Sequence, residues 1–145
     1  MILYLDTSAL VKLYVDEAHS AFIRSAASRA SVRVSHDIAY VECCAAFARR
    51  RSDGSLAPGD HARCRRQLDR DWEQFTVIAV TADLIRRAAT LVEHHALRAY
   101  DGVHLAAAEA AASVVKRRTE FRFAAFDAGL IEVARSNSLA LLTPV

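Results

Sequence analysis

The sequence has few of the residues that interrupt regular secondary structure. Its 145 residues include only four Gly and two Pro, which is too few for a protein built from many short strands and tight turns. Apolar residues make up 53%, and alanine supplies much of that fraction. Alanine has the highest helix propensity because ordering it costs no side-chain entropy. The composition therefore excludes a turn-rich all-β protein and favours closely packed helices, which we expect to form one domain over residues 1–145.

Paired cysteines and long apolar runs are also missing. Cys43, Cys44 and Cys64 are an odd number without a CxxC spacing, so we expect reduced cysteines that pack in the interior rather than a disulfide framework or a zinc site. No apolar run approaches the length of a membrane span. The apolar residues 2–5 are too few for a signal sequence and have no basic segment before them. We therefore expect a cytoplasmic protein with no membrane association.

An excess of charge of one sign is lacking as well, since the net charge is only +2. The basic residues are nevertheless unevenly distributed, because arginine greatly outnumbers lysine and basic residues cluster at 49–51, at 63, 65 and 66, and at 116–118. The planar arginine side chain suits phosphate recognition. Solvated helix faces explain each cluster equally well. Both interpretations stay open.

Short apolar segments alternate with helical segments along the whole chain. Runs typical of strands buried on both faces occupy residues 2–5, 32–35, 76–80, 121–126 and 139–142. Helices are predicted at residues 9–15, 19–30, 37–51, 58–72, 82–94, 98–112 and 128–136. This alternation predicts an α/β fold in which helices cover both faces of a central parallel sheet.

Two acidic residues directly follow predicted strands. Asp6 ends the first strand, and Asp127 ends the strand at 121–126. The carboxyl ends of parallel strands open into the ligand crevice of such sheets, so both carboxylates are candidate site residues. An Asp in this position can instead cap the following helix, and this alternative stays open for each.

Two further acidic residues lie on the apolar sides of predicted helices. Glu42 falls within the stripe formed by Ile38, Val41, Ala45 and Ala46, and Asp101 shares a face with Leu97, Leu105 and Ala108. A buried carboxylate costs several kcal/mol unless it is paired or binds a metal. Pairing with a buried arginine, or a position at the edge of the core, are the alternatives. His104 could approach the same site, although we favour packing in the core for it.

Four carboxylates that converge would repel one another unless a cation neutralised them. Ligands that are all oxygen favour Mg²⁺ or Mn²⁺ over zinc, and the sequence contains no HExxH motif. Such ions can activate water and polarise a phosphodiester. The acidic residues therefore predict metal-assisted phosphoryl chemistry.

Short segments around these acids resemble, in order, the motifs of PIN-domain nucleases. They are YLDTSAL at residues 4–10, YVE at 40–42 and YDGVHLA at 100–106. FDAGL at 126–130, followed by LALLTP at 139–144, resembles the last acidic motif and the closing strand. Length and motifs are most similar to the VapC toxins of bacterial toxin–antitoxin modules.

The resemblance implies a three-layer α/β/α sandwich with an acidic metal site and endoribonuclease activity. It also implies a VapB-type antitoxin as partner and a homodimer. It assigns metal binding to Asp6, Glu42, Asp101 and Asp127 and a supporting hydroxyl to Ser8. Family members often have Ser or Thr two positions before the last acid, where this chain has Ala125. Asp127 is therefore the least secure of the four ligands.

Other functions fit the sequence less well. A dehalogenase-like phosphatase needs a second Asp two positions after the first, where this chain has Ser8, and nucleotide-binding glycine motifs are missing. Two alternatives remain within the resemblance: a PIN nuclease of RNA processing outside any toxin module, and a PIN-like scaffold that binds RNA or protein without cutting. The presence of all four acids favours an active enzyme.

Overall fold

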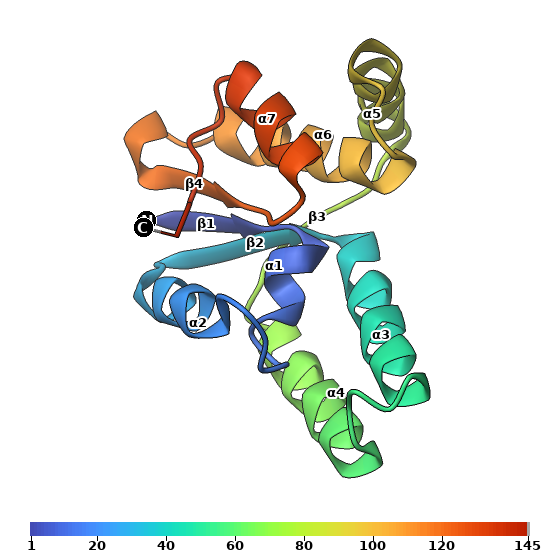
Figure 1. The fold of residues 1–145 in the computed structure, drawn as a ribbon. Helices are drawn as coiled ribbons and strands as arrows, with labels where there is room; N and C mark the ends of the chain where they lie inside the picture. Colours follow the sequence, from blue (N-terminus) through green and yellow to red (C-terminus); the bar gives the residue numbers. More distant parts are fainter. Residues whose placement is uncertain (145) are drawn as a thin grey trace.

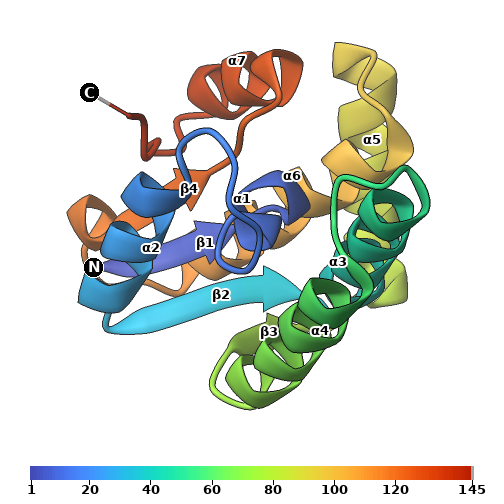
Figure 2. The same ribbon diagram turned by 60° about the horizontal axis from the view of Figure 1, so that its bottom comes forward.

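Four strands form one parallel sheet in a computed structural model of the protein, which describes residues 1–144. The strands are β1 (Ile2–Leu5), β2 (Val32–His36), β3 (Thr76–Ile78) and β4 (Phe121–Ala124), in the order β3-β2-β1-β4. β1 is central, because Ile2 is in register with Val32 on one side and with Phe121 on the other. Figure 2 shows β1 between these two neighbours. The carboxyl ends of β1 and β4 therefore lie side by side.

One layer of helices covers the lower face of the sheet in Figure 1. It consists of α1 (Thr7–Val11), α2 (Ser20–Arg29), α3 (Asp37–Ser52) and α4 (Pro58–Trp72). Leu3 and Leu5 of β1 point into this layer, where they pack with buried residues such as Leu10, Ile23 and Phe47. Successive strand residues point to opposite faces, so Tyr4 between them points into the other layer.

The second layer lies on the upper face and consists of α5 (Ala82–His95), α6 (Ala99–Ser113) and α7 (Ala128–Ser136), with a short 3₁₀ turn at Arg118–Glu120. Its core includes Tyr4, Leu91, Leu105 and Leu130. Two hydrophobic cores on opposite faces of a parallel sheet confirm the predicted three-layer α/β/α sandwich. No helix within residues 1–144 has the length and apolar character to cross a membrane.

The helices α5 and α6 approach each other very closely at Gly102. A Cβ atom at this position would lie 2.3 Å from Cγ1 of Val92 and 3.1 Å from the carbonyl oxygen of Ala88. Only a residue without a side chain fits this crossing. The close approach fixes the first turn of α6, which carries Asp101.

The prediction of a fifth strand at residues 139–142 is wrong. This segment pairs with the sheet at a single bridge, between Leu141 and Phe123. Phe123 donates its N–H to the carbonyl of Ala140 and accepts from Leu142, each at 2.8 Å. Pro144 has no N–H to extend the pairing, so the segment stays beside β4 without becoming a full strand.

Two strands end earlier than predicted because their last residues bond elsewhere. The N–H of Val80 donates to the Asp37 carboxylate at 3.0 Å, which takes it out of β3. The N–H of Phe126 donates to the Ser8 hydroxyl at 2.9 Å, which takes it out of β4. The second bond joins the segment before Asp127 to the segment after Asp6.

The buried face of α3 also differs from the predicted stripe. Val41 and Ala45 are exposed, whereas Ala39, Cys43 and Phe47 are buried. Glu42 therefore lies at the edge of the buried face instead of its centre. The helix is turned so that this carboxylate lies near His36 at the end of β2 and near His104 of α6.

Candidate active site

A cleft of about 360 Å³ brings all four predicted acidic residues together. Each comes from a different part of the chain, namely the ends of β1 and β4 and the helices α3 and α6. The cleft is lined by Asp6, Thr7, Ser8, Val11, Lys12, Glu17, Glu42, Ala46, Arg50, Arg98, Tyr100, Asp101, His104 and Asp127. The parallel sheet explains this convergence, since the carboxyl ends of its strands share one edge.

Asp6 is the most enclosed of the four acids, with an exposed fraction of 4%. It caps α1, and its Oδ1 accepts hydrogen bonds from the Ser8 hydroxyl at 2.7 Å and the Ala9 N–H at 2.8 Å. Burial raises the pKa of its carboxyl, and the charge of Asp101 adds to this effect, whereas His104 and the two hydrogen bonds oppose it. Asp6 thus caps the helix, as one interpretation of the sequence predicted, and also lines the cleft, so its role as a site residue stays a prediction.

The Ser8 hydroxyl joins the two edges of the cleft. It donates to Asp6 and accepts from the N–H of Phe126, the residue before Asp127. This contact fixes both the rotamer of Asp6 and the start of the loop that carries Asp127. The supporting position expected for Ser8 agrees with this geometry.

Asp101 and Asp127 share one arginine. Arg98 donates through Nε to Asp101 at 2.8 Å and through a terminal nitrogen to Asp127 at 3.2 Å. The arginine is 75% exposed, so it screens the two carboxylates from the solvent side. Asp127 also caps α7 by accepting from the Leu130 N–H at 2.9 Å. The sequence analysis missed Arg98, although its position three residues before Asp101 on a helix was a usable signal.

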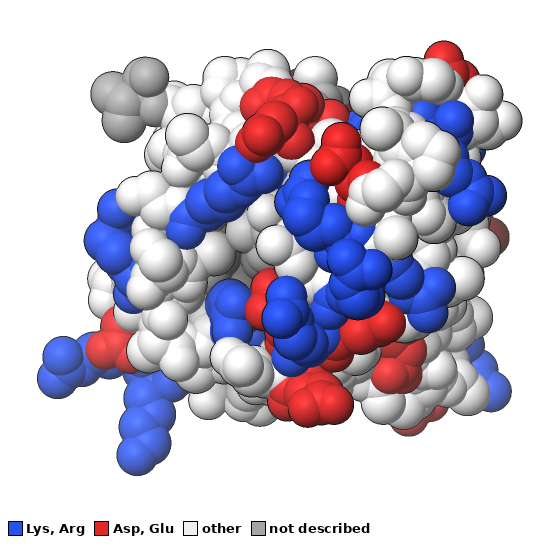
Figure 3. All heavy atoms as spheres, turned by 90° about the horizontal axis from the view of Figure 1, so that it is seen from below, with Lys and Arg blue, Asp and Glu red and all other residues white. Residues whose placement is uncertain are grey.

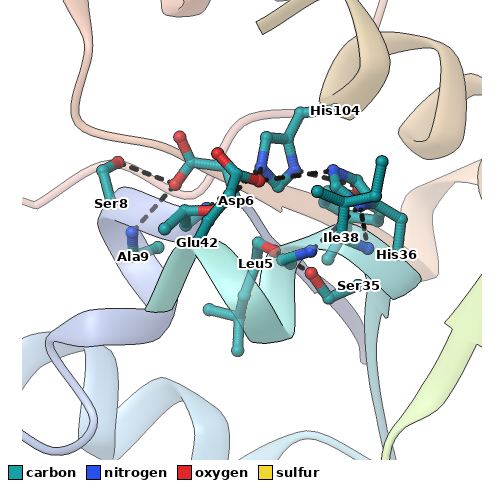
Figure 4. Close-up of polar contacts among 12 residues, drawn as sticks. Leu5, Asp6, Ser8, Ala9, Ser35, His36, Ile38, Glu42 and His104 are labelled. Carbon is teal, nitrogen blue, oxygen red and sulfur yellow. Dashed lines mark hydrogen bonds and ion pairs between the residues drawn. The ribbon is translucent and has the colours of Figure 1, made fainter. Parts of the chain in front are cut away.

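Glu42 contacts two buried histidines that come from different layers of the fold (Figure 4). His104 Nε2 lies 3.1 Å from Oε1 of Glu42, and His36 Nε2 lies 3.9 Å from the same oxygen. The two imidazole rings are 4.0 Å apart between centroids. His36 was not considered in the sequence analysis. The residue lies at the end of a strand and before Asp37, where a capping role was the only available signal.

The hydrogen bonds determine which nitrogen of the His36 ring carries a proton. His36 Nδ1 accepts from the N–H groups of Ile38 and Ala39, so the proton of the neutral ring is on Nε2. Burial, together with the neighbouring His104, lowers the pKa of His36 to about 3, which keeps the ring neutral. His104 Nδ1 lies 3.2 Å from the Tyr4 hydroxyl, and its Nε2 lies 3.1 Å from Oε1 of Glu42 and accepts from the Thr7 N–H at 3.4 Å. His36 Nε2 lies 3.9 Å from the same oxygen of Glu42, beyond hydrogen-bond distance, and has no other partner within the described residues.

The same assignment argues against metal binding by this trio. His36, Glu42 and His104 are the one group of three ligand-type residues within residues 1–144 whose donor atoms all lie within 4.8 Å of one another. A histidine binds a metal through an unprotonated nitrogen. The unprotonated nitrogen of His36 already accepts from the backbone of α3. The histidines are therefore arranged to hold Glu42.

A hard divalent cation fits the carboxylates better. No three of the four carboxylates within the described residues bring their oxygens within 4.8 Å of one another, so they do not form a closed cage. Mg²⁺ usually keeps several waters and is held by one or two carboxylates, and an open cleft allows that. Burial and the charge of Asp101 raise the pKa of the Asp6 carboxyl, and a bound cation would oppose both effects. The donor set therefore fits Mg²⁺ or Mn²⁺ with water completing the coordination.

Basic residues occupy another part of the same cleft. Lys12 and Arg50 both pair with Glu17, at 2.8 Å and 2.6 Å. None of the three was a candidate from the sequence, because Arg50 lies 33 residues from Glu17 and only the fold joins it to Lys12 and Glu17. Figure 3 shows Lys and Arg side chains beside Asp and Glu side chains around a hollow on one face of the molecule. The cleft thus offers acidic groups for a cation and basic groups for an anion.

The chain matches known proteins over most of its length. The PIN domain family matches residues 3–136. The chain is 34% identical to ribonuclease VapC45 of Mycobacterium tuberculosis over 111 residues, which are 74% of this chain and 74% of that protein.

Solved structures with the same fold include VapC20 of Mycobacterium tuberculosis, described as a toxin that cleaves the sarcin-ricin loop. It has a TM-score of 0.66 and 19% identity, over 90% of this chain and 93% of that chain. A toxin–antitoxin complex from Klebsiella pneumoniae has a TM-score of 0.66 and 12% identity, over 99% of this chain and 98% of that chain. At these identities the two similarities show the fold alone.

Proposed function

This chain belongs to the PIN domain family, and we propose that it is a VapC-type endoribonuclease, the toxin of a toxin–antitoxin module. One observation carries the proposal: Asp6, Glu42, Asp101 and Asp127 come from four separate segments and line a single cleft. The relationship to ribonuclease VapC45 supports RNA as the substrate. We further propose that residues 1–145 act as one nuclease domain in the cytoplasm.

The four carboxylates are the proposed ligands of Mg²⁺ or Mn²⁺. The bound ion would polarise the phosphodiester and lower the pKa of the attacking water. Asp6 and Asp101 are the principal ligands in this proposal, because their charges interact and both side chains are largely enclosed. Asp127 is more exposed and is already bonded to the first turn of α7, so its role is secondary.

The surrounding residues keep these carboxylates charged and oriented. Ser8 and the Ala9 N–H fix Oδ1 of Asp6, which leaves its other oxygen for the cleft. His104 Nε2 contacts Oε1 of Glu42 at 3.1 Å, which leaves Oε2 for the cleft. Arg98 neutralises Asp101 and Asp127 and must release at least one of them when a cation binds.

Partners follow from the same family relationship. We propose a VapB-type antitoxin that covers the cleft, and a homodimer as the assembly of the toxin. The fold shared with a toxin–antitoxin complex from Klebsiella pneumoniae supports the first of these. An antitoxin arginine that reached the carboxylates would occupy the place of the cation by the same charge attraction.

Cleavage mapping of a structured RNA tests the proposed activity. The wild type is compared with Asp6→Asn and with Asp83→Asn, a matched change at an exposed acid outside the cleft. We expect cleavage with Mg²⁺ or Mn²⁺ by the wild type and Asp83→Asn, and none by Asp6→Asn. The products should carry 5′-phosphate and 3′-hydroxyl ends, because activated water attacks instead of the ribose 2′-hydroxyl. Full activity in EDTA, or 2′,3′-cyclic phosphate ends, would contradict the proposal.

A further inference from the structure

Lys12, Glu17 and Arg50 form a basic cluster that the carboxylate chemistry does not use. Lys12 Nζ contacts one oxygen of Glu17 and Arg50 contacts the other, at 2.8 Å and 2.6 Å. Two cations therefore share one carboxylate, which leaves one positive charge without a partner in the cluster. All three residues line the cleft that holds the four acids.

The burial of these side chains is unusual for an ordinary surface ion pair. The side chain of Lys12 is only 10% exposed and that of Arg50 is 28% exposed. Lys12 Nζ also lies 4.5 Å from the ring centroid of Phe126, the residue before Asp127. An enclosed lysine needs an anion beside it, because burying an unpaired charge costs free energy.

The shape of the cluster matches a phosphate group. Glu17 presents two oxygens to two separate cations, and a phosphodiester presents its two non-bridging oxygens in a similar way. Burial opposes ionisation of Glu17, but the hydrogen bonds from Lys12 and Arg50 outweigh it and lower the pKa of its carboxyl. The cluster thus strongly favours a bound anion.

We propose that Lys12 and Arg50 bind an RNA phosphate next to the scissile one, and that Glu17 occupies this anion site until RNA arrives. The proposal rests on the proposed ribonuclease function. Because the anion site and the acidic site share one cleft, a single strand whose scissile phosphate lies at the carboxylates continues along the cleft to the two cations. The phosphate then takes over the hydrogen bonds that Glu17 receives, and Glu17 turns toward solvent.

The salt dependence of RNA binding measures such a contact directly. Each phosphate neutralised on a single strand changes the slope of log K against log salt by about 0.7. The protein carries Asp6→Asn throughout, so that the RNA stays intact, and binding of a fluorescent single-stranded RNA is followed by anisotropy between about 50 and 200 mM salt. Lys12→Met and Arg50→Gln are compared with Arg49→Gln, an exposed arginine on the same helix outside the cleft.

We expect the slope to become shallower by about 0.7 when both cleft substitutions are combined, by part of this amount in each single cleft variant, and to stay unchanged in Arg49→Gln. In the cleaving enzyme, the same variants should raise KM by about tenfold or more with little change in kcat, because the lost contact is a charge-assisted hydrogen bond made equally in the ground and transition states. Glu17→Gln should lower KM, since it removes the competing carboxylate. Lys12→Arg should retain most of the affinity.

A purely structural role makes a different set of predictions. If the cluster only joins the segment after α1 to α3, the cleft variants will lower the melting temperature while the slope and KM stay as in the wild type, and this result would overturn the inference. Arg50→Gln keeps the test decisive if Lys12→Met fails to fold. A wild type that cleaves no RNA refutes the proposed function itself, whereas a cleaving wild type with unaltered variants refutes the phosphate site alone.

Discussion

Asp6 carries its charge in a place that opposes ionisation. Its carboxylate is buried, and Asp101 in the same cleft adds to the rise in its pKa. Hydrogen bonds from Ser8 and Ala9 offset part of this cost. A cation bound at Asp6 would therefore stabilise a carboxylate whose ionised form is otherwise unfavourable.

Replacing Asp6 by Asn should abolish cleavage without unfolding the protein. The amide keeps an oxygen for the Ser8 and Ala9 bonds and removes the buried charge. In metal-free buffer we expect a melting temperature equal to or above that of the wild type. Added Mg²⁺ should raise the melting temperature of the wild type more than that of the variant, because a ligand stabilises only the state that binds it. A variant that unfolds in EDTA would show that Asp6 is structural.

Asp127 should contribute less to catalysis than Asp6 or Asp101. Its side chain is 41% exposed, compared with 15% for Asp101, and Ala125 supplies no hydroxyl beside it. We expect Asp127→Asn, which preserves the cap of α7, to lower the cleavage rate less than Asp101→Asn does. If the two variants lost the same share of the cleavage rate at every metal concentration, Asp127 would be as important as Asp101.

A hydroxyl at residue 125 should improve metal binding through Asp127. Lost hydrogen-bond support for a ligand typically costs about 10–100-fold in metal affinity or activity. Ala125→Thr is therefore expected to lower the metal concentration needed for half-maximal cleavage, whereas Ala125→Val, a change of the same shape, is not. Ala125 is buried, so the melting temperature of both variants controls for misfit. A gain from Thr that persists together with Asp127→Ala would exclude an effect through Asp127.

The candidate site was predictable from the sequence where a residue's role depends on its own element. Asp6 and Ser8 follow a strand, and Asp101 lies in the first turn of a helix, so local pattern located them. His36, Arg98 and Lys12 act through partners brought together by the fold, namely Glu42, Asp127 and Glu17. The sequence does not show that Arg98 reaches Asp127 or that Arg50 shares Glu17 with Lys12, although the spacing of Arg98 and Asp101 alone was a usable signal.

At the level of elements, α3 begins on a histidine that can titrate. His36 accepts from two N–H groups of the first turn only while its ring is neutral, and its pKa is about 3 against an ordinary value of 6.5. The unfolded chain therefore binds a proton that the folded chain rejects. The stabilisation is complete above about pH 6.5 and is lost as the pH falls toward 3.

His36→Asn should therefore make stability less sensitive to acid. Asn can cap the helix with its side-chain oxygen and does not titrate. In EDTA, we expect the wild type to lose melting temperature between pH 6.5 and 4.5 more steeply than the variant, because each unit of pKa difference is worth about 1.4 kcal/mol. His94→Asn, at an exposed position near the end of α5, serves as the control and should follow the wild type. If the melting temperatures of all three proteins fell in parallel with pH, His36 would not be the neutral cap of α3.

The crossing of α5 and α6 should tolerate no side chain at Gly102. The clash with Val92 forces the helices apart, and overpacking of this kind costs about 1–3 kcal/mol. Gly59→Ala is the matched control in another helix, since a Cβ there meets nothing within 4 Å. Urea unfolding should show a large decrease in the free energy of unfolding for Gly102→Ala and no decrease for Gly59→Ala. Adding Val92→Ala to Gly102→Ala should restore part of this free energy. Equal stability of the two alanine variants would rule out the close crossing.

The order and type of the elements were predictable because strongly apolar strands alternate with helices of regular period. The ends of β3 and β4 were not, because a side chain distant in sequence takes the next N–H in each case, Asp37 for Val80 and Ser8 for Phe126. The segment at 139–142 has the composition of a strand, but only Leu141 forms a bridge with the sheet. Strand length here depends on competition for hydrogen bonds, which composition does not reveal.

For the molecule as a whole, the proposed function predicts toxicity on expression. Wild-type protein produced alone should arrest bacterial growth, and Asp6→Asn should not, because cleavage requires the acidic cleft. Co-expression of the cognate antitoxin should restore growth. Growth curves at matched expression levels measure both the arrest and its relief. Harmless expression of a protein that cleaves RNA would indicate a processing nuclease outside a toxin module.

The place of β4 beside β1 also determines when activity can arise during translation. β1 leaves the ribosome before β4, but its register joins Ile2 to Phe121, so one of its two edges stays open until β4 has been made. A nascent chain that ends before that point holds Asp6 and Glu42 without Asp127. The cleft is therefore completed only after Asp127 has been synthesised. A ribosome that makes this proposed ribonuclease is thus exposed to finished molecules, and unfinished ones lack a complete site.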